Sequence, residues 1–133
     1  MWLYEDKEVD ELPPDCVGFV YLITNVATGR MYIGKKGTIS TRRVKVKNRK
    51  SRKVVRKESD WRTYYGSSAA LLLDVEACGK NGFKREITRF CRSKAEMSYY
   101  EIKQQIDNEV LFKPDLYYNN FVGCRIHAKH FKT

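Results

Sequence analysis

The segment from residue 17 to residue 34 constrains the fold more than any other part of the chain. Residues 17–24 are rich in β-branched and aromatic side chains, residues 25–29 supply turn formers, and residues 30–34 are again typical of a strand. Two apolar runs separated by such a turn predict a β-hairpin with a loop of about five residues. The fold should therefore begin with an antiparallel pair of strands.

The residues that follow predict a helix and a third strand. Ser68 can cap a helix through residues 71–76, and Gly79 marks its end. Residues 83–91 have the composition of a strand, although their pattern does not fix which face points inward. A strand in this position would add to the hairpin.

A second helix should begin at Ser93, because Ser93 and Glu96 have the spacing of a capping box. This helix is expected to run to about Glu109, with Glu101 near its middle. The order strand, strand, helix, strand, helix predicts an α+β fold in which helices flank a small antiparallel three-stranded sheet. A chain of 133 residues is expected to hold one hydrophobic core.

The composition divides the chain into a central domain and two ends. Residues 1–15 are acidic and finish at Pro13-Pro14, which predicts a loosely attached arm outside the core. Residues 16–126 should form the folded domain, and residues 127–133 a tail. No stretch of roughly 18 apolar residues occurs and the acidic start is unlike a signal peptide, so a cytoplasmic protein without a membrane partner is expected.

The cysteines and histidines give no clear metal signature. The four cysteines, Cys16, Cys78, Cys91 and Cys124, lie far apart in the sequence. Zinc sites and redox motifs use closely spaced pairs, so reduced and mostly buried thiols are expected. His127 and His130 could bind a metal, but their place near the end of the chain favours a solvated tail.

One segment carries the whole excess of positive charge. From Arg30 to Arg62 there are 14 basic residues against Glu58 and Asp60, whereas the remainder has 12 basic and 14 acidic residues. Such a block repels itself unless a polyanion lies against it, which favours nucleic acid. A hydrated loop or acidic lipid is the alternative, although no apolar stripe supports a membrane surface. Residues 38–57 are ambiguous between a short helix and an exposed β-ribbon that extends from the body.

Several short motifs follow one another along the chain. Tyr21 ends the triplet Phe19-Val20-Tyr21, and Tyr32 begins the triplet Tyr32-Ile33-Gly34 eleven residues later. Further motifs follow: Lys35-Lys36, Trp61-x-x-Tyr64-x-Gly66-Ser67-Ser68, Ser98-Tyr99-Tyr100-Glu101 and Tyr117-Tyr118-Asn119. This series resembles the GIY-YIG nuclease superfamily, and within it the SegE-like branch of phage endonucleases, from about residue 17 to residue 126. The first triplet departs from the pattern and keeps only its tyrosine.

The resemblance implies an enzyme that hydrolyses DNA phosphodiester bonds with one divalent cation, Mg²⁺ or Mn²⁺. It implies Tyr21 as the general base and Tyr32 as the group that positions water or phosphate, and it leaves open which tyrosine loses its proton. Glu101 corresponds to the metal-binding carboxylate, which suits Mg²⁺ because that ion prefers oxygen ligands and keeps several waters. Asn119, or adjacent Asn120, corresponds to an asparagine that orients the site.

The resemblance also implies an arginine about ten residues after the second tyrosine. Arg42 fits this position and Arg43 is the alternative. A guanidinium suits bidentate contact with a scissile phosphate. Otherwise both arginines are ordinary members of the basic block that contact backbone phosphates without specificity.

The basic insertion, residues 44–59, is expected to grip DNA. The predicted phosphate-binding cations are Lys35, Lys36, Arg43, Lys45, Lys47, Arg49, Lys50, Arg52 and Lys53. Trp61 is predicted to stack on a base, or else to anchor a loop to the core. The family's histidine between the arginine and the glutamate is missing, so Tyr64 or Tyr65 is expected to take its place near the substrate.

The partner expected from these features is double-stranded DNA, cut or nicked by a phage or mobile-element enzyme of the homing type. One active site cuts one strand at a time, so a double-strand break would need a homodimer on DNA or a second encounter. Because the first triplet is degenerate and the histidine is missing, the alternative is a catalytically inactive, basic DNA-binding module. A structural protein without salt-sensitive DNA binding is a third, weaker alternative.

Overall fold

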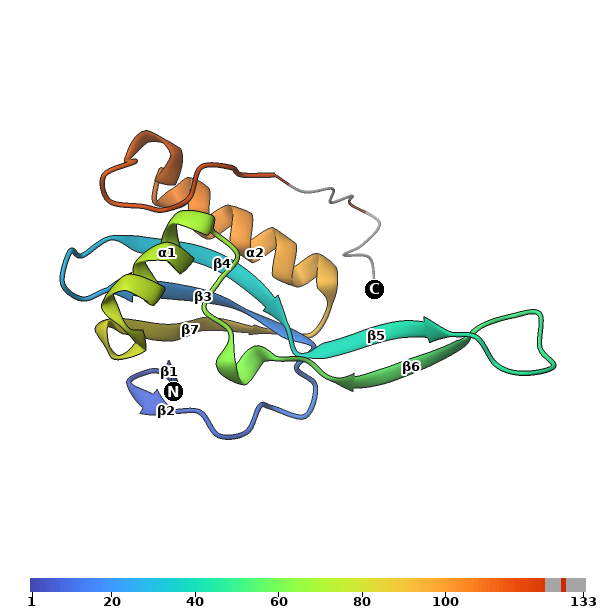
Figure 1. Cartoon of the computed structure of the whole chain (residues 1–133). Helices are drawn as coiled ribbons and strands as arrows, with labels where there is room; N and C mark the ends of the chain where they lie inside the picture. The colour runs from blue at the N-terminus through green and yellow to red at the C-terminus, as the bar shows by residue number, and fades with distance from the viewer. Residues whose placement is uncertain (124–127, 129–133) are drawn as a thin grey trace.

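The predicted hairpin is present in the computed structural model, which describes residues 1–123 and Ala128 (Figure 1). Strands β3 (Gly18–Asn25) and β4 (Met31–Gly37) pair antiparallel, with Gly18 opposite Gly37 and Thr24 opposite Met31. The loop turns at Gly29, whose φ of 76° is a conformation that glycine adopts without strain. The hairpin prediction is therefore confirmed.

The sheet is larger than predicted. Strand β7 (Phe83–Cys91) pairs antiparallel with β3 and, on its other side, parallel with β1 (Trp2–Tyr4), which pairs with β2 (Lys7–Glu8). The order is β2-β1-β7-β3-β4. The prediction of a three-stranded antiparallel sheet is correct for β7, β3 and β4 but misses two strands and the parallel pairing.

The two missed strands come from the N-terminal segment. Trp2 is only 1% exposed, its indole nitrogen donates a hydrogen bond to the Trp61 carbonyl oxygen at 2.6 Å, and its ring lies 5.0 Å edge-on from Phe19. The prediction that residues 1–15 form an arm outside the core is therefore wrong. The acidic composition was misleading because the acidic residues lie in the turn and at the solvated edge, while one large aromatic side chain, that of Trp2, enters the core.

Two helices cover opposite faces of the sheet, as predicted. Helix α1 (Ala69–Cys78) begins where the Ser68 hydroxyl accepts a hydrogen bond from the Leu71 amide. Helix α2 (Lys94–Asp107) begins where the Ser93 hydroxyl accepts one from the Glu96 amide, and it ends two residues before the predicted Glu109. Short 3-10 turns, η1 (Trp61–Thr63), η2 (Lys80–Gly82) and η3 (Val110–Phe112), complete the elements.

The burial of β3 explains the three-layer arrangement. Phe19, Tyr21 and Ile23 pack in a cluster with α1, whereas Val20 packs in a second cluster with Met97 of α2. Successive side chains of a strand point to opposite faces, so both faces of β3 are covered. This gives β3 the continuous apolar character of a central strand.

The basic segment forms a separate two-stranded β-ribbon. Strand β5 (Ile39–Val44) pairs antiparallel with β6 (Lys53–Glu58), and the ribbon projects away from the sheet (Figure 1). Its residues are almost all exposed on both faces. The ambiguity between helix and ribbon is thus resolved in favour of the ribbon, because β5 and β6 pair from Ile39 opposite Glu58 to Val44 opposite Lys53.

Among the described residues, Cys16 and Cys91 are buried and Cys78 is exposed, and all three are free thiols. Cys124, His127 and His130 lie outside the described residues, as does the predicted tail except for Ala128. Within the described part of the chain, no helix has the length and apolar character needed to cross a membrane.

Candidate active site

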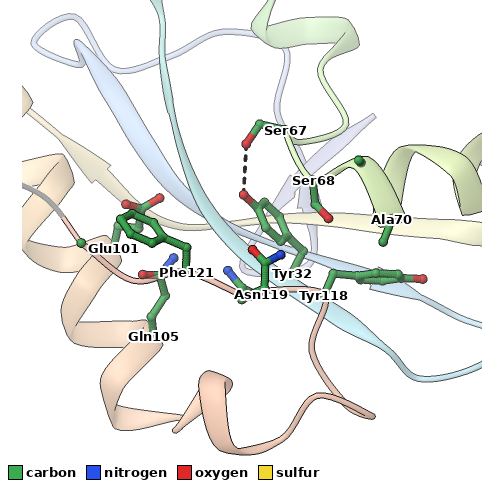
Figure 2. Close-up of a pocket in the computed structure, with 12 residues that line it drawn as sticks. Tyr32, Ser67, Ser68, Ala70, Glu101, Gln105, Tyr118, Asn119 and Phe121 are labelled. Carbon is green, nitrogen blue, oxygen red and sulfur yellow. Dashed lines mark hydrogen bonds between the residues drawn. The ribbon is translucent and has the colours of Figure 1, made fainter.

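A cavity of about 510 Å³ lies between β4, the start of α1 and the middle of α2 (Figure 2). Three of the residues predicted to carry the chemistry, Tyr32, Glu101 and Asn119, share its wall. The full lining consists of Tyr32, Ser67, Ser68, Ala69, Ala70, Glu101, Gln105, Tyr118, Asn119, Asn120, Phe121 and Gly123. The fold therefore gathers side chains from separate parts of the sequence at one cavity.

The two signature tyrosines are neighbours on one face of the hairpin. Tyr21 lies opposite Gly34, two residues beyond Tyr32 on the partner strand, and the two rings are 6.1 Å apart. A side chain at position 34 would collide with the Tyr21 hydroxyl and press on the Tyr32 ring. The glycine of the second triplet is thus needed for Tyr21 to lie across β4.

The Tyr21 hydroxyl is enclosed by protein. The residue is 1% exposed and does not line the cavity, and its ring lies 6.0 Å from that of Tyr64. Burial holds the pKa of Tyr21 well above its ordinary value, and the adjacent Tyr64 and Tyr32 hydroxyls raise it further. Tyr21 is therefore a neutral phenol in the free protein at neutral pH.

The Tyr32 hydroxyl, by contrast, faces the cavity. It lies 3.1 Å from the Ser67 hydroxyl, within hydrogen-bonding distance (Figure 2). Burial raises the pKa of Tyr32, and the Ser67 hydrogen bond partly offsets this rise. Of the two tyrosines, Tyr32 has the hydroxyl that a substrate in the cavity can reach.

Glu101 enters the same cavity from α2. Burial raises the pKa of its carboxyl, while the charge of Lys35 and a hydrogen bond from the Lys35 backbone amide lower it. The Lys35 ammonium itself donates to the Ser98 hydroxyl at 2.6 Å, one turn before Glu101. Lys35 thus fixes the carboxylate through its backbone and stabilises its charged form through its side chain.

The donor set at the cavity fits a magnesium-type cation. Glu101 supplies a carboxylate oxygen and Tyr32 a hydroxyl oxygen, which are hard ligands. Among the described residues, no group of three or more histidine, cysteine, aspartate or glutamate side chains could hold a metal. One carboxylate with waters and a substrate phosphate would satisfy Mg²⁺, but zinc would lack its usual ligands.

Asn119 holds β4 in place. Its amide oxygen accepts from the Ile33 amide at 3.0 Å, and its amide nitrogen donates to the Ile33 carbonyl at 2.7 Å. Gln105 donates to the same carbonyl at 3.0 Å. Asn119 is buried and Asn120 is exposed, so the geometry assigns the orienting contacts to Asn119.

Neither candidate arginine lies at the cavity. Arg42 is opposite Val55 and Arg43 opposite Val54, both on the exposed ribbon. Neighbouring residues of a strand point to opposite faces, so the two guanidinium groups lie on opposite sides of the ribbon. The expected convergence of an arginine with the tyrosines and Glu101 is absent from this arrangement, because β5 leaves the body directly after Gly37.

Of the aromatic residues predicted to contact nucleic acid, Trp61 is buried, whereas Tyr64 and Tyr65 are half-buried. Trp61 is 1% exposed, so the prediction that it stacks on a base is wrong and the alternative, a core anchor, holds. Tyr64 packs between Tyr21 and Lys36, and Tyr65 packs against Arg85. Tyr64 therefore lies beside Tyr21 as a half-buried ring, and its role in place of the missing histidine stays a prediction.

The remaining predicted cations divide into two groups. Lys35 and Lys36 lie on β4, where Lys36 forms an ion pair with Asp60 at 2.6 Å. The second group, exposed on the ribbon and its connecting loop, comprises Arg43, Lys45, Lys47, Arg49, Lys50, Arg52 and Lys53.

Among the lining residues that were not predicted, two make side-chain hydrogen bonds at β4. Ser67 contacts the Tyr32 hydroxyl, and Gln105 helps to hold the Ile33 carbonyl. Gln105 could have been found from the sequence, because it follows Glu101 by four positions and shares its helix face. Ser67 belongs to the Gly66-Ser67-Ser68 motif, but no local pattern indicates that its hydroxyl meets a tyrosine 35 positions earlier.

Comparison with known proteins gives one match. A family model described as "Putative endonuclease segE, GIY-YIG domain" matches residues 2–122. Neither a curated protein nor a solved structure matches the chain. The matched range includes the N-terminal strand β1, the ribbon and every described residue that lines the cavity except Gly123.

Proposed function

The chain belongs to the SegE GIY-YIG endonuclease-domain family, and from this premise we propose that it hydrolyses phosphodiester bonds of double-stranded DNA with one divalent cation. One observation carries the proposal: Tyr32 and Glu101 line the same cavity, and Asn119 holds β4, the strand that bears Tyr32. The exposed cations of the ribbon support DNA as the partner. In this proposal the enzyme is a phage or mobile-element nuclease.

Attack on phosphorus requires a positioned water that gives up a proton. We assign contact with the reacting water or with a phosphate oxygen to Tyr32, because its hydroxyl faces the cavity. The family resemblance assigns the general base to Tyr21. Since the Tyr21 hydroxyl is enclosed beside Gly34 and Tyr64, this role requires that DNA binding uncover it.

Glu101 is the proposed protein ligand of Mg²⁺ or Mn²⁺. When bound, the cation supplies positive charge for the transition state and for the departing 3′ oxygen. Glu101 must be ionised to hold it, and the nearby charge of Lys35 favours that form. Asn119 and Gln105 keep β4 in register, so that Tyr32 stays in position relative to Glu101.

Arg42 is proposed to contact a phosphate of the bound DNA from the ribbon, with Arg43 as the alternative on the opposite face. Their location on β5 means that either reaches the DNA as part of the ribbon's contact. The cations of the connecting loop would neutralise further phosphates. This contact gives affinity that falls steeply with salt and carries little sequence information.

Plasmid cleavage tests the proposal. Wild type, Tyr21→Phe, Tyr32→Phe and Glu101→Ala are incubated with supercoiled plasmid and Mg²⁺, and DNA affinity is measured in parallel. Wild type should nick or linearise the plasmid, whereas all three variants should lose cleavage by about 10²-fold or more and keep their affinity. Unchanged cleavage by Glu101→Ala would refute the metal assignment.

An inactive DNA-binding module is the second candidate, favoured by one observation. Neither Arg42 nor Arg43 lines the cavity. In the plasmid assay this module would bind DNA with strong salt dependence but produce no nicks with Mg²⁺ or Mn²⁺. The same assay separates single nicks from double-strand breaks, and a dependence of linearisation on the square of protein concentration would indicate two copies on the DNA.

A further inference from the structure

Within the described residues, the ribbon has little packing against the body beyond the point where it joins the sheet. Both faces of β5 and β6 are exposed along nearly all their length. A two-stranded ribbon of this kind is marginally stable in water. Its direction must therefore be set where it joins the body.

That junction, which we call the ribbon foot, consists of residues 37–38 and 58–62. Thr38 is buried, its amide donates to the Val17 carbonyl at 2.9 Å, and its own carbonyl accepts from the Ser59 amide at 2.9 Å. The Ser59 hydroxyl donates to the Gly37 carbonyl at 2.6 Å. The segment that leads into β5 and the segment that follows β6 are thus hydrogen-bonded to each other, and the first is also bonded to Val17 next to the sheet.

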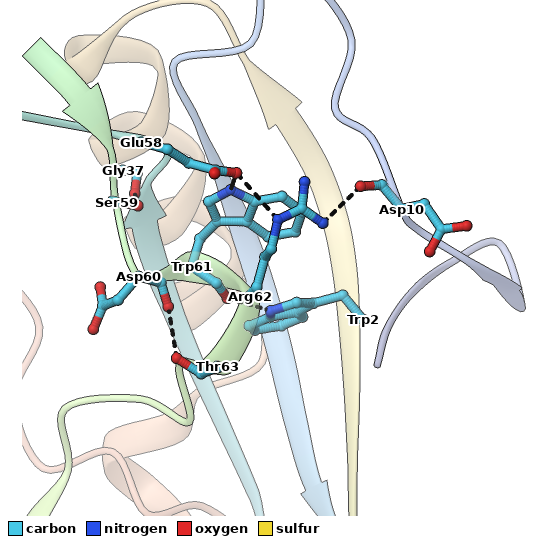
Figure 3. A network of polar contacts seen from close by, with 9 residues as sticks. All are labelled: Trp2, Asp10, Gly37, Glu58, Ser59, Asp60, Trp61, Arg62 and Thr63. Carbon is cyan, nitrogen blue, oxygen red and sulfur yellow. Dashed lines mark hydrogen bonds and ion pairs between the residues drawn. The ribbon is translucent and has the colours of Figure 1, made fainter.

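Glu58 and Arg62 complete the foot (Figure 3). The Glu58 carboxylate accepts from the Trp61 indole at 2.9 Å and from the Arg62 guanidinium at 3.1 Å. Arg62 also donates to the Asp10 carbonyl at 2.7 Å and lies 4.4 Å above the Trp61 ring. The last residue of the ribbon is thereby connected to a buried tryptophan and to the N-terminal segment.

The distribution of charge supports a structural role for these residues. Glu58 and Asp60 are the two acidic residues of the segment 30–62, and both lie in the foot, where they pair with Arg62 and Lys36. Among the residues that the structure describes, none of the cations from Arg42 to Lys57 forms an ion pair. A carboxylate next to DNA opposes binding, so we attribute these two acids to the contacts that they make in the foot.

The foot also contacts the active site. The Lys36 ammonium, paired with Asp60, lies 4.0 Å above the ring of Tyr64, which in turn lies 6.0 Å from Tyr21. A change in the direction of the ribbon would therefore displace groups packed on a catalytic candidate.

We propose that the ribbon foot is a rigid spacer that fixes the distance between the DNA held by the ribbon and the phosphodiester that is cut, with Glu58 and Arg62 as its positioning residues. The inference rests on the proposed nuclease function. A major groove admits a two-stranded β-ribbon, so duplex DNA is the partner. Loss of the foot contacts should leave affinity intact and spread the cut over neighbouring phosphodiesters.

The first measurement needs no nuclease activity. One spin label is attached at Cys78, which is exposed, and one at Ser51→Cys in the ribbon loop, in a chain that also carries Cys124→Ser. Cys16 and Cys91 are buried and remain unlabelled. The unmodified foot should give one narrow distance distribution. Glu58→Ala and Arg62→Ala should broaden it, and Glu58→Gln, which keeps an acceptor for Trp61, should broaden it less.

The second measurement maps cut positions on an end-labelled duplex that contains the strongest wild-type site. Wild type should cut one phosphodiester per strand, whereas Glu58→Ala should cut several adjacent ones with an affinity within about twofold of wild type. Asp107→Ala is the matched control. It removes the Lys103–Asp107 pair on α2, which has the same four-residue spacing and similar exposure as the Arg62–Glu58 pair.

A narrow distance distribution in Glu58→Ala, or an unchanged single cut, would overturn the inference. So would equal broadening by Asp107→Ala. Failure of the proposed function looks different, because wild type would then cut no DNA while the spin-label distances still report whether the foot is rigid. Thermal unfolding of each variant identifies any loss of folding.

Discussion

At the scale of single residues, the site depends on how burial changes the protonation of three oxygen acids. Tyr21 and Tyr32 have raised pKa values because both are shielded from water, so neither is a phenolate in the free protein near neutrality. The carboxyl of Glu101 also has a raised pKa, but Lys35 partly offsets the effect of burial. Lys35 therefore favours the charged form of Glu101 without lining the cavity itself.

Lys35→Met should shift the acid side of the pH profile to higher pH. The substitution removes the charge that lowers the pKa of Glu101, so the carboxyl binds its proton up to a higher pH and loses the cation earlier as pH falls. The measurement is kcat/KM for DNA nicking against pH at fixed Mg²⁺, and the midpoint of the acid limb is the readout. Lys103→Met, an exposed α2 lysine, is the control. Coinciding midpoints for Lys35→Met and wild type would contradict the assigned role.

At the scale of elements, the cavity and the positive charge belong to different parts of the fold. The sheet and α2 hold Tyr32 and Glu101 at the cavity, whereas the ribbon carries cations that no acidic side chain of the described chain neutralises. A polyanion laid along β5 and β6 would relieve their mutual repulsion. These two strands, which are almost wholly exposed, are thus also the strands of the described chain whose positive charge is least neutralised.

Replacing three loop lysines by glutamine should reduce the salt dependence of DNA binding. If Lys45, Lys47 and Lys50 each neutralise one phosphate, the slope of log K against log salt should fall by about 2.7 in magnitude. Fluorescence anisotropy on a duplex at several salt concentrations measures it. The control replaces Lys80, Lys103 and Lys113, which removes the same charge from exposed positions outside the ribbon. Equal slopes for the two triple variants would show that only net charge matters.

At the scale of the whole molecule, short sequence patterns predicted most helices and strands but not which strands pair with one another. The turn at Gly29 and the caps at Ser68 and Ser93 were readable because they act within a few residues. Strand β1 was missed because its three residues lie in an acidic context and its pairing with β7 spans more than 80 positions.

The sequence likewise predicted some residues of the candidate site but not the positions of others. Tyr32, Glu101 and Asn119 were found because the family motifs identify them, and the structure brings them to one cavity. The position of Arg42 could not be predicted from the sequence. The spacing of apolar and basic residues in 38–57 fits equally a helix beside the site and a ribbon that projects away from it. The burial of Trp61 depends on contacts with Trp2 and Phe19, which no local pattern encodes.

Trp2→Ala should destabilise the whole domain. The side chain is buried against Phe19 and Tyr21, so its removal leaves a cavity and should lower the free energy of unfolding by about 3–5 kcal/mol. Urea unfolding followed by circular dichroism measures the change. Phe112→Ala, an aromatic that is 83% exposed, should change the free energy by less than about 0.5 kcal/mol. A small effect of Trp2→Ala would instead support a dispensable N-terminal arm.

The contacts that hold β4 also decide how copies of this protein can associate. The backbone amide of Met31 donates to the Leu116 carbonyl, that of Ile33 to Asn119, and that of Lys35 to Glu101, so the outer edge of the strand is occupied along its length. At the opposite edge, β2 has only two residues. Within the described residues, the β4 and β2 edges therefore offer a second molecule little backbone on which to extend the five-stranded sheet, which protects these two edges against edge-to-edge aggregation.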